Sequence, residues 1–372
     1  MSYIKLLMFL AMWTPAFSQA AELGEGLNDL EVHGFLSQGY IKTTANQYLT
    51  TSNQGSFDFT EAALNFTKRL SQEFRMGFQF FAQNLGQDGS FRSRFDWFYL
   101  DYSENVNASI RIGRIKMPFG LYNEYRDIDT GRMPVLLPQS VYNITSRDLL
   151  LALNGIELYG RIGSSQWRYN LYGGTIHTDL DETVEFLDVP YIYGGRLFWE
   201  SPAENLTFGL SAQVVEINLE LPINNVPLSA DLSGVLAALS FEYQFLSSTL
   251  AIEYSPRFLK LETSNNNIFP SRDADSEHAY IMYNYQWTHN FGLGSYASVQ
   301  YNDREDKTSR DKRQYDFAIY TRVDLNENWL VKFETHRMDG SALLNAQLNK
   351  VPAVSSLKQD WWAFLIKTTG YF

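Results

Sequence analysis

One segment of mixed charge carries most of the residues in this sequence that could do chemistry. Residues 113–143 read GRIKMPFGLYNEYRDIDTGRMPVLLPQSVYN and interleave cations with carboxylates. Cationic groups that face carboxylates across a narrow aqueous path set up a field that acts on passing ions. The candidate solute-facing residues in and just before this segment are Arg111, Arg114, Lys116, Glu124, Arg126, Asp127, Asp129 and Arg132.

The same charges have a second, compatible interpretation as ion pairs that hold a long segment against a wall. Arg111 and Arg114 have odd spacing for one face of a strand, in which alternate side chains share a face. A β-bulge at Gly113 would bring both to the same face. The segment also contains Leu121, Val135 and Leu137, which a solvated, disordered loop would not carry.

A further set of charges lies on alternate positions of segments with strand character. The basic members are Arg75, Arg161, Arg168, Arg196, Arg322 and Lys332. The acidic members are Glu61, Glu157, Glu200, Glu242, Asp316 and Glu334. We expect Arg75, Arg161, Arg196 and Glu157 to be solute-facing. The two signs are too evenly balanced to predict a preference for anions or cations.

Few residues in the sequence suggest a catalytic site or a metal site. Of the five histidines, His177 lies near Asp179 and Asp181, but no nucleophile motif accompanies them, so a solvated loop is the favoured interpretation. The acidic stretches 177–188 and 271–277 lack the spacing of an EF-hand calcium loop. The chain has no cysteine, which excludes disulfides and zinc-thiolate sites. We therefore expect no catalytic residues, no metal and no cofactor.

The elements that must position these charges are short alternating segments separated by turns. About sixteen strands are predicted, an even number, as in single-chain bacterial membrane barrels. They are residues 32–43, 58–69, 73–84, 92–103, 106–117, 153–163, 166–176, 190–200, 205–217, 235–246, 248–256, 278–288, 292–303, 313–324, 328–338 and 360–372.

The connections between these strands alternate in length. The short links include LSQ at 70–72, EN at 104–105 and SS at 164–165. The other links are long, at 44–57, 85–91, 118–152, 177–189, 218–234, 257–277, 304–312 and 339–359. Short turns at one end and long loops at the other are typical of a transmembrane antiparallel β-barrel with periplasmic turns and outer loops. A soluble β-sandwich has no reason to sort its loops in this way.

The faces of the predicted strands agree with a barrel in lipid. Phe74, Met76, Phe78 and Phe80 share one face of their strand, opposite Arg75 and Gln79. The pattern predicts an apolar outer face and a polar interior. Aromatic residues near strand ends are expected in interfacial girdles. These are Tyr40, Trp97, Tyr99, Trp167, Trp199, Trp287, Trp329 and Trp361.

Both ends of the chain carry recognisable signals. Residues 1–20 contain one basic residue, Lys5, then an apolar stretch, and end in the small-residue cleavage pattern Ser18-Gln19-Ala20. We expect this segment to be a signal peptide that is cleaved after Ala20, rather than a buried helix. At the other end DWWAFLIKTTGYF is predicted to be the strand that closes the barrel, with Trp362, Phe364, Ile366 and Phe372 toward lipid and Lys367 toward water.

Composition limits the function classes. Aromatics make up 15% of the chain, yet mean hydropathy is −0.27, and no run after the signal approaches the ~20 apolar residues of a membrane helix. Loss of residues 1–20, which include Lys5 and no acid, changes the net charge from −12 to −13. A chain this acidic is not expected to bind nucleic acid.

One domain is expected, residues 21–372, with loop 118–152 folded into the pore.

The stretches GRIKMPFGLYNEYRD, LLPQSVYN and EVHGFLSQGY resemble the Gram-negative outer-membrane porin family that includes the phosphate-selective porins O and P and dicarboxylate-type porins. The resemblance implies sixteen strands, an in-folded third loop, a homotrimer and diffusion of small hydrophilic solutes, with phosphate or dicarboxylates as candidates. The final Phe372 resembles the signal read by the barrel-assembly machinery. The expected surroundings are outer-membrane lipid and lipopolysaccharide.

Three other classes of outer-membrane barrel fit the sequence less well. A barrel enzyme lacks a supporting motif. A gated transporter of hydrophobic compounds needs a plug domain, and residues 21–31 are too short for one. A structural or adhesion barrel tends to have fewer strands and a filled interior, whereas about sixteen strands leave an aqueous channel.

Overall fold

The computed structural model describes residues 29–85, 91, 93–177, 186–223, 226–267 and 270–372. The predicted signal peptide, residues 1–20, lies outside this part of the chain. So do Asp179 and Asp181, the carboxylates considered as partners of His177.

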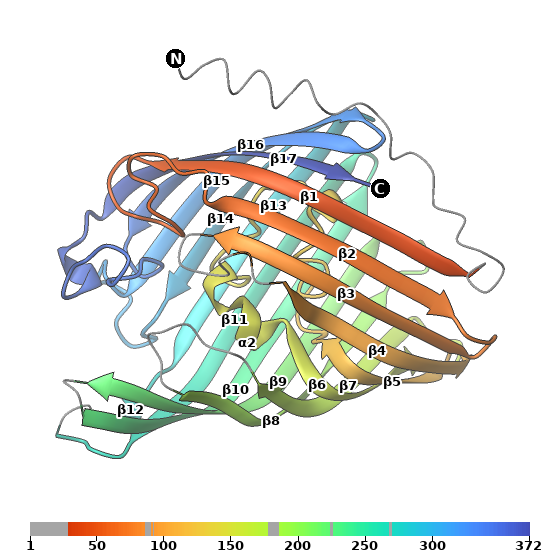
Figure 1. Ribbon diagram of the computed structural model, residues 1–372, viewed down its shortest axis with the longest axis horizontal. Coiled ribbons are helices and arrows are strands. Elements are labelled where there is room, and N and C mark those ends of the chain that lie inside the picture. Colours follow the sequence, from red (N-terminus) through yellow and green to blue (C-terminus); the bar gives the residue numbers. More distant parts are fainter. Residues whose placement is uncertain (1–28, 86–90, 92, 178–185, 224–225, 268–269) are drawn as a thin grey trace.

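The described residues form an all-β chain of sixteen long strands and one two-residue strand (Figure 1). The strands of the first half are β1 (Leu30–Thr43), β2 (Phe59–Arg69), β3 (Phe74–Leu85), β4 (Arg94–Asn105), β5 (Ala108–Lys116), β6 (Ala152–Arg161), β7 (Trp167–His177) and β8 (Phe186–Glu200). Those of the second half are β9 (Leu206–Ile223), β10 (Val226–Phe245), β11 (Ser248–Thr263), β12 (Arg272–Asp273), β13 (Ser276–Thr288), β14 (Phe291–Tyr301), β15 (Arg313–Asn326), β16 (Trp329–Gly340) and β17 (Asp360–Tyr371).

These strands close into a barrel. Each long strand pairs antiparallel with its neighbours, and β1 pairs with both β2 and β17. The closing register runs from Phe35 opposite Tyr371 to Thr43 opposite Ala363. Closure matters because an unpaired strand edge in lipid leaves backbone groups without hydrogen-bond partners, at several kcal/mol each. The prediction of an antiparallel transmembrane barrel of about sixteen strands is confirmed.

Among the residues that the structure describes, helical structure is confined to short pieces. They are η1 (Asp129–Gly131), η2 (Ile144–Ser146), α2 (Arg147–Leu150) and η3 (Val354–Ser356). Within the described residues, no helix has both the length and the apolar character needed to cross a membrane.

The connections sort by length largely as predicted, but strands extend into two of the predicted loops. In residues 257–277, β11 continues to Thr263 and β12 is formed. The β9–β10 hairpin extends through most of residues 218–234, which were expected to be a loop. Asn218 pairs with Asp231 and Pro222 with Pro227, so the ladder continues to Ile223 opposite Val226. The alternation of Val215, Ile217 and Leu219 already continued past the predicted end of that strand.

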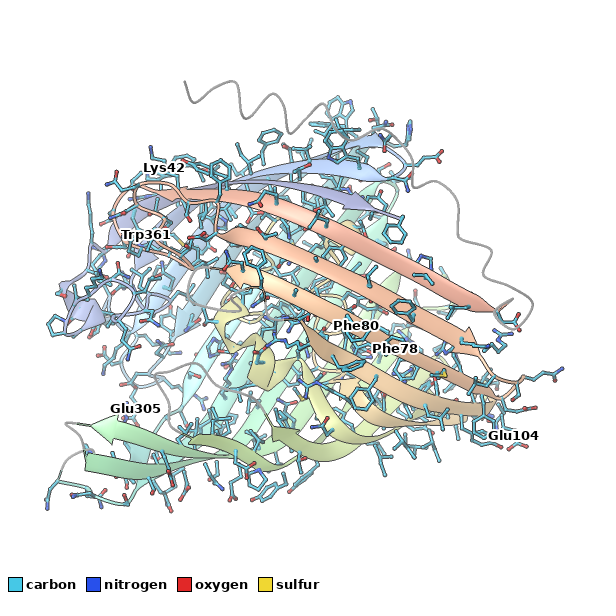
Figure 2. The ribbon with its side chains drawn as sticks, in the orientation of Figure 1. Lys42, Phe78, Phe80, Glu104, Glu305 and Trp361 are labelled. Carbon is cyan, nitrogen blue, oxygen red and sulfur yellow. The ribbon has the colours of Figure 1, made fainter. Side chains whose placement is uncertain are left out.

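The wall has an apolar outer face and a mixed inner face. On β17, Trp362, Phe364 and Ile366 are exposed, and Ala363 and Leu365 are buried. Figure 2 shows Phe78 and Phe80 on β3, and their rings lie 5.7 Å apart on the outer face of the barrel. This alternation is the pattern expected for strands between lipid and an interior.

Two predictions for β17 are wrong. Lys367 was expected to face water, but its side chain is fully buried and pairs with Glu61. Trp361 was expected in an interfacial girdle, but it is fully buried, and its ring packs 5.2 Å from that of Tyr48 in the outer loop 44–58. Both side chains point inward, where loop segments that fold into the barrel cover them.

The suggested bulge at Gly113 is also absent. Pairing runs through this residue without a register shift, with Tyr99 on one side and Gly155 on the other. Gly113 has φ +139°, and a Cβ there would lie 2.3 Å from the carbonyl oxygen of Phe98. Only glycine adopts this backbone conformation readily.

We expect Gly113→Ala to destabilise the barrel by about 3 kcal/mol or more, because the strain of a non-glycine residue adds to a backbone clash. Gly163→Ala is the matched control: Gly163 has φ +58° and open space around its Cβ position, so we expect a loss of about 1–2 kcal/mol. Urea unfolding from lipid vesicles measures both values. Equal losses would contradict the close approach at Gly113.

Candidate functional site

The long segment between β5 and β6, residues 117–151, lies inside the barrel (Figure 1). It carries η1, η2 and α2 and has no strand neighbour along its length. We call it the inserted segment. Its backbone groups therefore need partners other than a β-ladder, and charged side chains of the wall supply many of them.

Strand β16 holds the middle of the inserted segment with two buried charges. The Lys332 ammonium donates to the carbonyl oxygens of Asp129 at 2.6 Å, Arg132 at 2.8 Å and Pro134 at 3.3 Å. The Glu334 carboxylate accepts from the amide of Val135 at 2.5 Å. Lys332 thus satisfies backbone carbonyl acceptors of the inserted segment, and Glu334 satisfies a backbone amide donor directly after them.

Asp129 is the charged centre of this contact. Its carboxylate lies 3.1 Å from the Lys332 nitrogen, 3.2 Å from Lys367 and 3.5 Å from Arg132, and it accepts from the Thr369 hydroxyl at 2.7 Å. Burial opposes ionisation of this carboxyl, but the Coulomb attraction of Lys332, Lys367 and Arg132 outweighs it and lowers the pKa of Asp129. The carboxylate is therefore charged at neutral pH.

A second anchor lies near the end of the inserted segment. Arg147, the first residue of α2, donates to Asp127 at 2.9 Å and to Asp96 of β4 at 2.6 Å. Lys116 lies 3.6 Å from Asp127 and donates to the carbonyl of Glu124. Burial disfavours the charged carboxylate, but the attraction of Arg147 and Lys116 lowers the pKa of Asp127.

A third anchor is Glu253 on β11. Its carboxylate accepts from the backbone amide of Leu121 at 2.9 Å and from the hydroxyls of Ser240, Tyr280 and Tyr142. Nearby, Arg196 of β8 lies 2.7 Å from Glu124.

Apolar packing seals the inserted segment against the wall and the outer loops. Val135 and Leu136 pack in one cluster with Tyr48 of loop 44–58, Leu344 of loop 341–359 and Trp361. Full burial of each aliphatic side chain contributes about 1.5–3 kcal/mol. The inserted segment is therefore packed tightly against the wall and the outer loops at these residues.

Toward the short turns the inner wall is open and its charges are arranged asymmetrically. Asp101 pairs with Arg75 and Arg111, and Glu200 pairs with Arg161 and Arg168. The exposed fractions of the Arg75, Arg161 and Arg168 side chains are 46%, 42% and 41%. Those of Asp101 and Glu200 are 2% and 18%. The cations project into the lumen, and the carboxylates lie behind them.

The structure divides the predicted site residues into separate groups. Arg75, Arg111 and Glu157 lie in one cluster around Asp101, in which Arg111 also donates to Glu157 at 2.9 Å. Arg161 lies at Glu200, and Arg196 lies at Glu124. Lys116 and Asp127 belong to the Arg147 anchor, and Asp129 and Arg132 to the Lys332 anchor.

Arg114 and Arg126 have no carboxylate partner within the described chain. Arg114 donates to the carbonyl oxygen of Asp96. Arg126 is buried and donates to the carbonyl oxygens of Tyr142 and Asn143. Burial lowers the pKa of Arg126 to about 10, which still leaves it charged at neutral pH.

Sequence reasoning missed Asp96, Asp101, Glu253 and Arg147, which are central to these contacts. Asp101 could have been found, because the alternation of β4 puts it on the face opposite Phe98 and Leu100. Asp96 could not, because a register shift between β3 and β4 at Gln79 and Phe80 changes the face on which it lies. Lys332 and Glu334 were expected in the open wall, but both are buried under the inserted segment.

We expect Asp129→Asn to cost about 3–5 kcal/mol of stability, because it leaves Lys332 and Lys367 buried without a shared counter-charge. The control is Asp303→Asn, which removes an exposed partner of Lys312 at 2.8 Å and should cost no more than about 1 kcal/mol. Urea unfolding from vesicles at neutral pH measures both, and similar losses would contradict a central role for Asp129.

The lowered pKa of Asp129 adds a pH dependence to that comparison. The stabilisation is fully present above the unfolded pKa of about 3.9 and is lost as pH falls toward the lower folded pKa. The wild type should therefore lose more stability below about pH 4 than Asp129→Asn does.

No protein-family model matches the chain, and no curated protein matches its sequence significantly. Solved structures do match. The anion-selective porin from Comamonas acidovorans superposes with TM-score 0.57 at 12% identity, covering 92% of this chain and 99% of that one. The outer-membrane channel DcaP of Acinetobacter baumannii gives 0.58 at 10% identity, covering 92% and 97%.

The in-vitro-folded OmpT of Vibrio cholerae, in a structure described as the trimer form, gives TM-score 0.57 at 10% identity, covering 92% of this chain and 99% of that one. At these identities the likeness shows the fold alone. The resemblance seen in the sequence motifs is confirmed at that level: the chain has the fold of the outer-membrane porins of Gram-negative bacteria.

Proposed function

We propose that the protein is an outer-membrane porin that lets small hydrophilic solutes diffuse through a water-filled channel. The observation that carries this proposal is the inserted segment, which is held inside a sixteen-strand barrel by buried charges while a charged wall stays open beside it. A barrel of this strand number encloses more space than its own wall side chains fill. The segment would narrow that space into a constriction.

The proposal places the protein in the outer membrane after removal of residues 1–20. Its surroundings would be membrane lipid and lipopolysaccharide, and the exposed apolar side chains of the outer face support this. Leu64, Phe95 and Phe98 are 42%, 52% and 44% exposed. Such side chains stabilise a barrel in lipid, whereas in water they would form a large apolar patch.

The channel is proposed to prefer anions. Arg75, Arg161 and Arg168 expose more than two fifths of their side chains to the lumen, whereas their carboxylate partners are largely covered. Charges that line a pore set which ions pass, and exposed cations raise the local concentration of anions. Phosphate and dicarboxylates are candidate solutes, since the Comamonas porin is described as anion-selective.

A homotrimer is proposed as the assembly. The OmpT structure with this fold is described as a trimer form. The outer face over β2–β4 carries rings in contact: those of Phe66 and Phe78 are stacked at 4.8 Å, and those of Phe80 and Phe95 are tilted at 4.4 Å. Flat aromatic surfaces of this kind suit contact with another subunit as well as lipid.

Planar-bilayer recording tests the channel directly. The purified wild-type protein should give stepwise ion currents, and the reversal potential in a potassium chloride gradient should have the sign of chloride preference. The physical reason is the exposed arginine set of the inner wall. Absence of any open-channel current would contradict the porin proposal, and cation preference would contradict the anion proposal alone.

The paired variant Arg161→Glu with Arg168→Glu should shift the reversal potential toward cations. One unit charge at about 4 Å in water is worth about 1 kcal/mol, or about fivefold in local ion concentration. Arg337→Glu is the matched control, because Arg337 is 40% exposed but lies on the outer face of β16, beside Trp362. Unchanged selectivity in the double variant would place both arginines outside the ion path.

Phe372 is proposed to serve the barrel-assembly machinery. Its backbone pairs with Gly34 in both directions, and its side chain is 49% exposed. We expect Phe372→Ala to reduce the amount of folded protein in the outer membrane more than Phe364→Ala, which removes a similar ring that is 46% exposed on the same strand. Heat-modifiable mobility on gels measures the folded fraction. Equal defects would contradict a signalling role.

A further inference from the structure

Most arginines of the barrel interior face a carboxylate. The paired set is Arg75, Arg94, Arg111, Arg132, Arg147, Arg161, Arg168, Arg196 and Arg322. Arg114 of β5, Arg126 of the inserted segment and Arg257 of β11 have no such partner within the described chain. Guanidinium groups without counter-ions in a protein interior are costly, so the surroundings of Arg126 and Arg257 need an explanation.

Both groups line the same cavity. It lies between the inserted segment and strands β9–β11, and its polar lining comes from Arg126, Arg257, Asn123 and Gln213. Its free volume is about 10 Å³, room for about one water-sized particle. Apolar side chains, among them Leu236 and Leu150, close the remaining sides.

The hydrogen bonds of the two arginines leave donor capacity unused. Arg126 donates to Asn123 Oδ1 at 3.3 Å and to the carbonyl oxygens of Tyr142 and Asn143. The buried Nε of Arg257 has no acceptor. A guanidinium offers five N–H donors in a fixed fork and no acceptor, so only an anion or a water can complete these contacts.

The nearest acid does not neutralise the pair. Asp127 follows Arg126 in sequence, but its carboxylate is bound by Arg147 at 2.9 Å and 3.0 Å and lies 3.6 Å from Lys116. The Glu253 carboxylate is also occupied, by the amide of Leu121 and three hydroxyls. The cavity therefore has an excess of positive charge.

We propose that this cavity is a binding site for one small monatomic anion, of the size of chloride or bromide, held between Arg126 and Arg257. This inference rests on the proposed anion channel and names an anion site within it. A cavity with room for about one water-sized particle favours a monatomic anion over phosphate or an organic carboxylate. A weakly hydrated guanidinium is a favourable partner for a halide.

Halide binding is tested with bromide as the probe. Crystals of the full-length wild-type protein grown with sodium bromide should show an anomalous peak in the cavity, within hydrogen-bond range of both guanidinium groups. Thermal unfolding in detergent should give a higher Tm in sodium chloride or bromide than in sodium gluconate at equal ionic strength, by on the order of 1–3 °C. No peak together with equal Tm values would overturn the proposal.

Variants at Arg257 localise the effect. Arg257→Met removes the charge while keeping an unbranched side chain, and it should abolish both the bromide peak and the halide dependence of Tm. Arg257→Lys should retain part of both. The control Arg304→Met removes an exposed arginine that lies over Phe258 on the outer face and should leave both unchanged. Retention of the full halide effect in Arg257→Met would overturn the assignment.

These measurements are independent of conduction. A protein that binds bromide but passes no current would support the anion site and contradict the porin proposal. A protein that conducts anions but shows no cavity bromide and no halide effect on Tm would support the porin proposal and contradict this site.

Discussion

Hydrogen-bond satisfaction of the backbone is the constraint on which the rest of this structure depends. Lipid offers no donors or acceptors, so every strand must pair on both sides and the sheet must close. The β1–β17 ladder, from Phe35 opposite Tyr371 to Thr43 opposite Ala363, meets that need. The terminal Phe372 adds two further backbone hydrogen bonds to Gly34.

The inserted segment faces the same constraint without strand neighbours. Its carbonyl and amide groups are satisfied by Lys332, Glu334, Glu253 and Arg126, all of which are buried. Buried charges are costly unless they are paired and hydrogen-bonded, which explains why Lys332, Lys367 and Arg132 converge on Asp129. The charges of this segment therefore form structural ion pairs, and the constriction that the same arrangement would create belongs to the proposed function.

The division between buried and exposed charge follows from this arrangement. Where the inserted segment covers the wall, cations and anions both disappear from solvent. Where the wall is open, the long arginine side chains reach past their short carboxylate partners, as Arg75 does at Asp101. At Arg75, Arg161 and Arg168 the charge that is exposed is therefore mainly positive.

Alternation, turn lengths and the terminal segments of the sequence by themselves determined the barrel, its strand number and the long third loop, because a two-residue period and a turn are local properties. They could not place Lys367, Trp361 or Arg257. The alternation of side chains along the strand shows that Lys367 points inward. Only the three-dimensional path of the inserted segment decides whether its side chain contacts water or the buried carboxylates of Glu61 and Asp129. Burial and pairing of a charge depend on residues hundreds of positions away, so the tertiary structure alone decided which charges anchor the segment and which remain free to meet an ion.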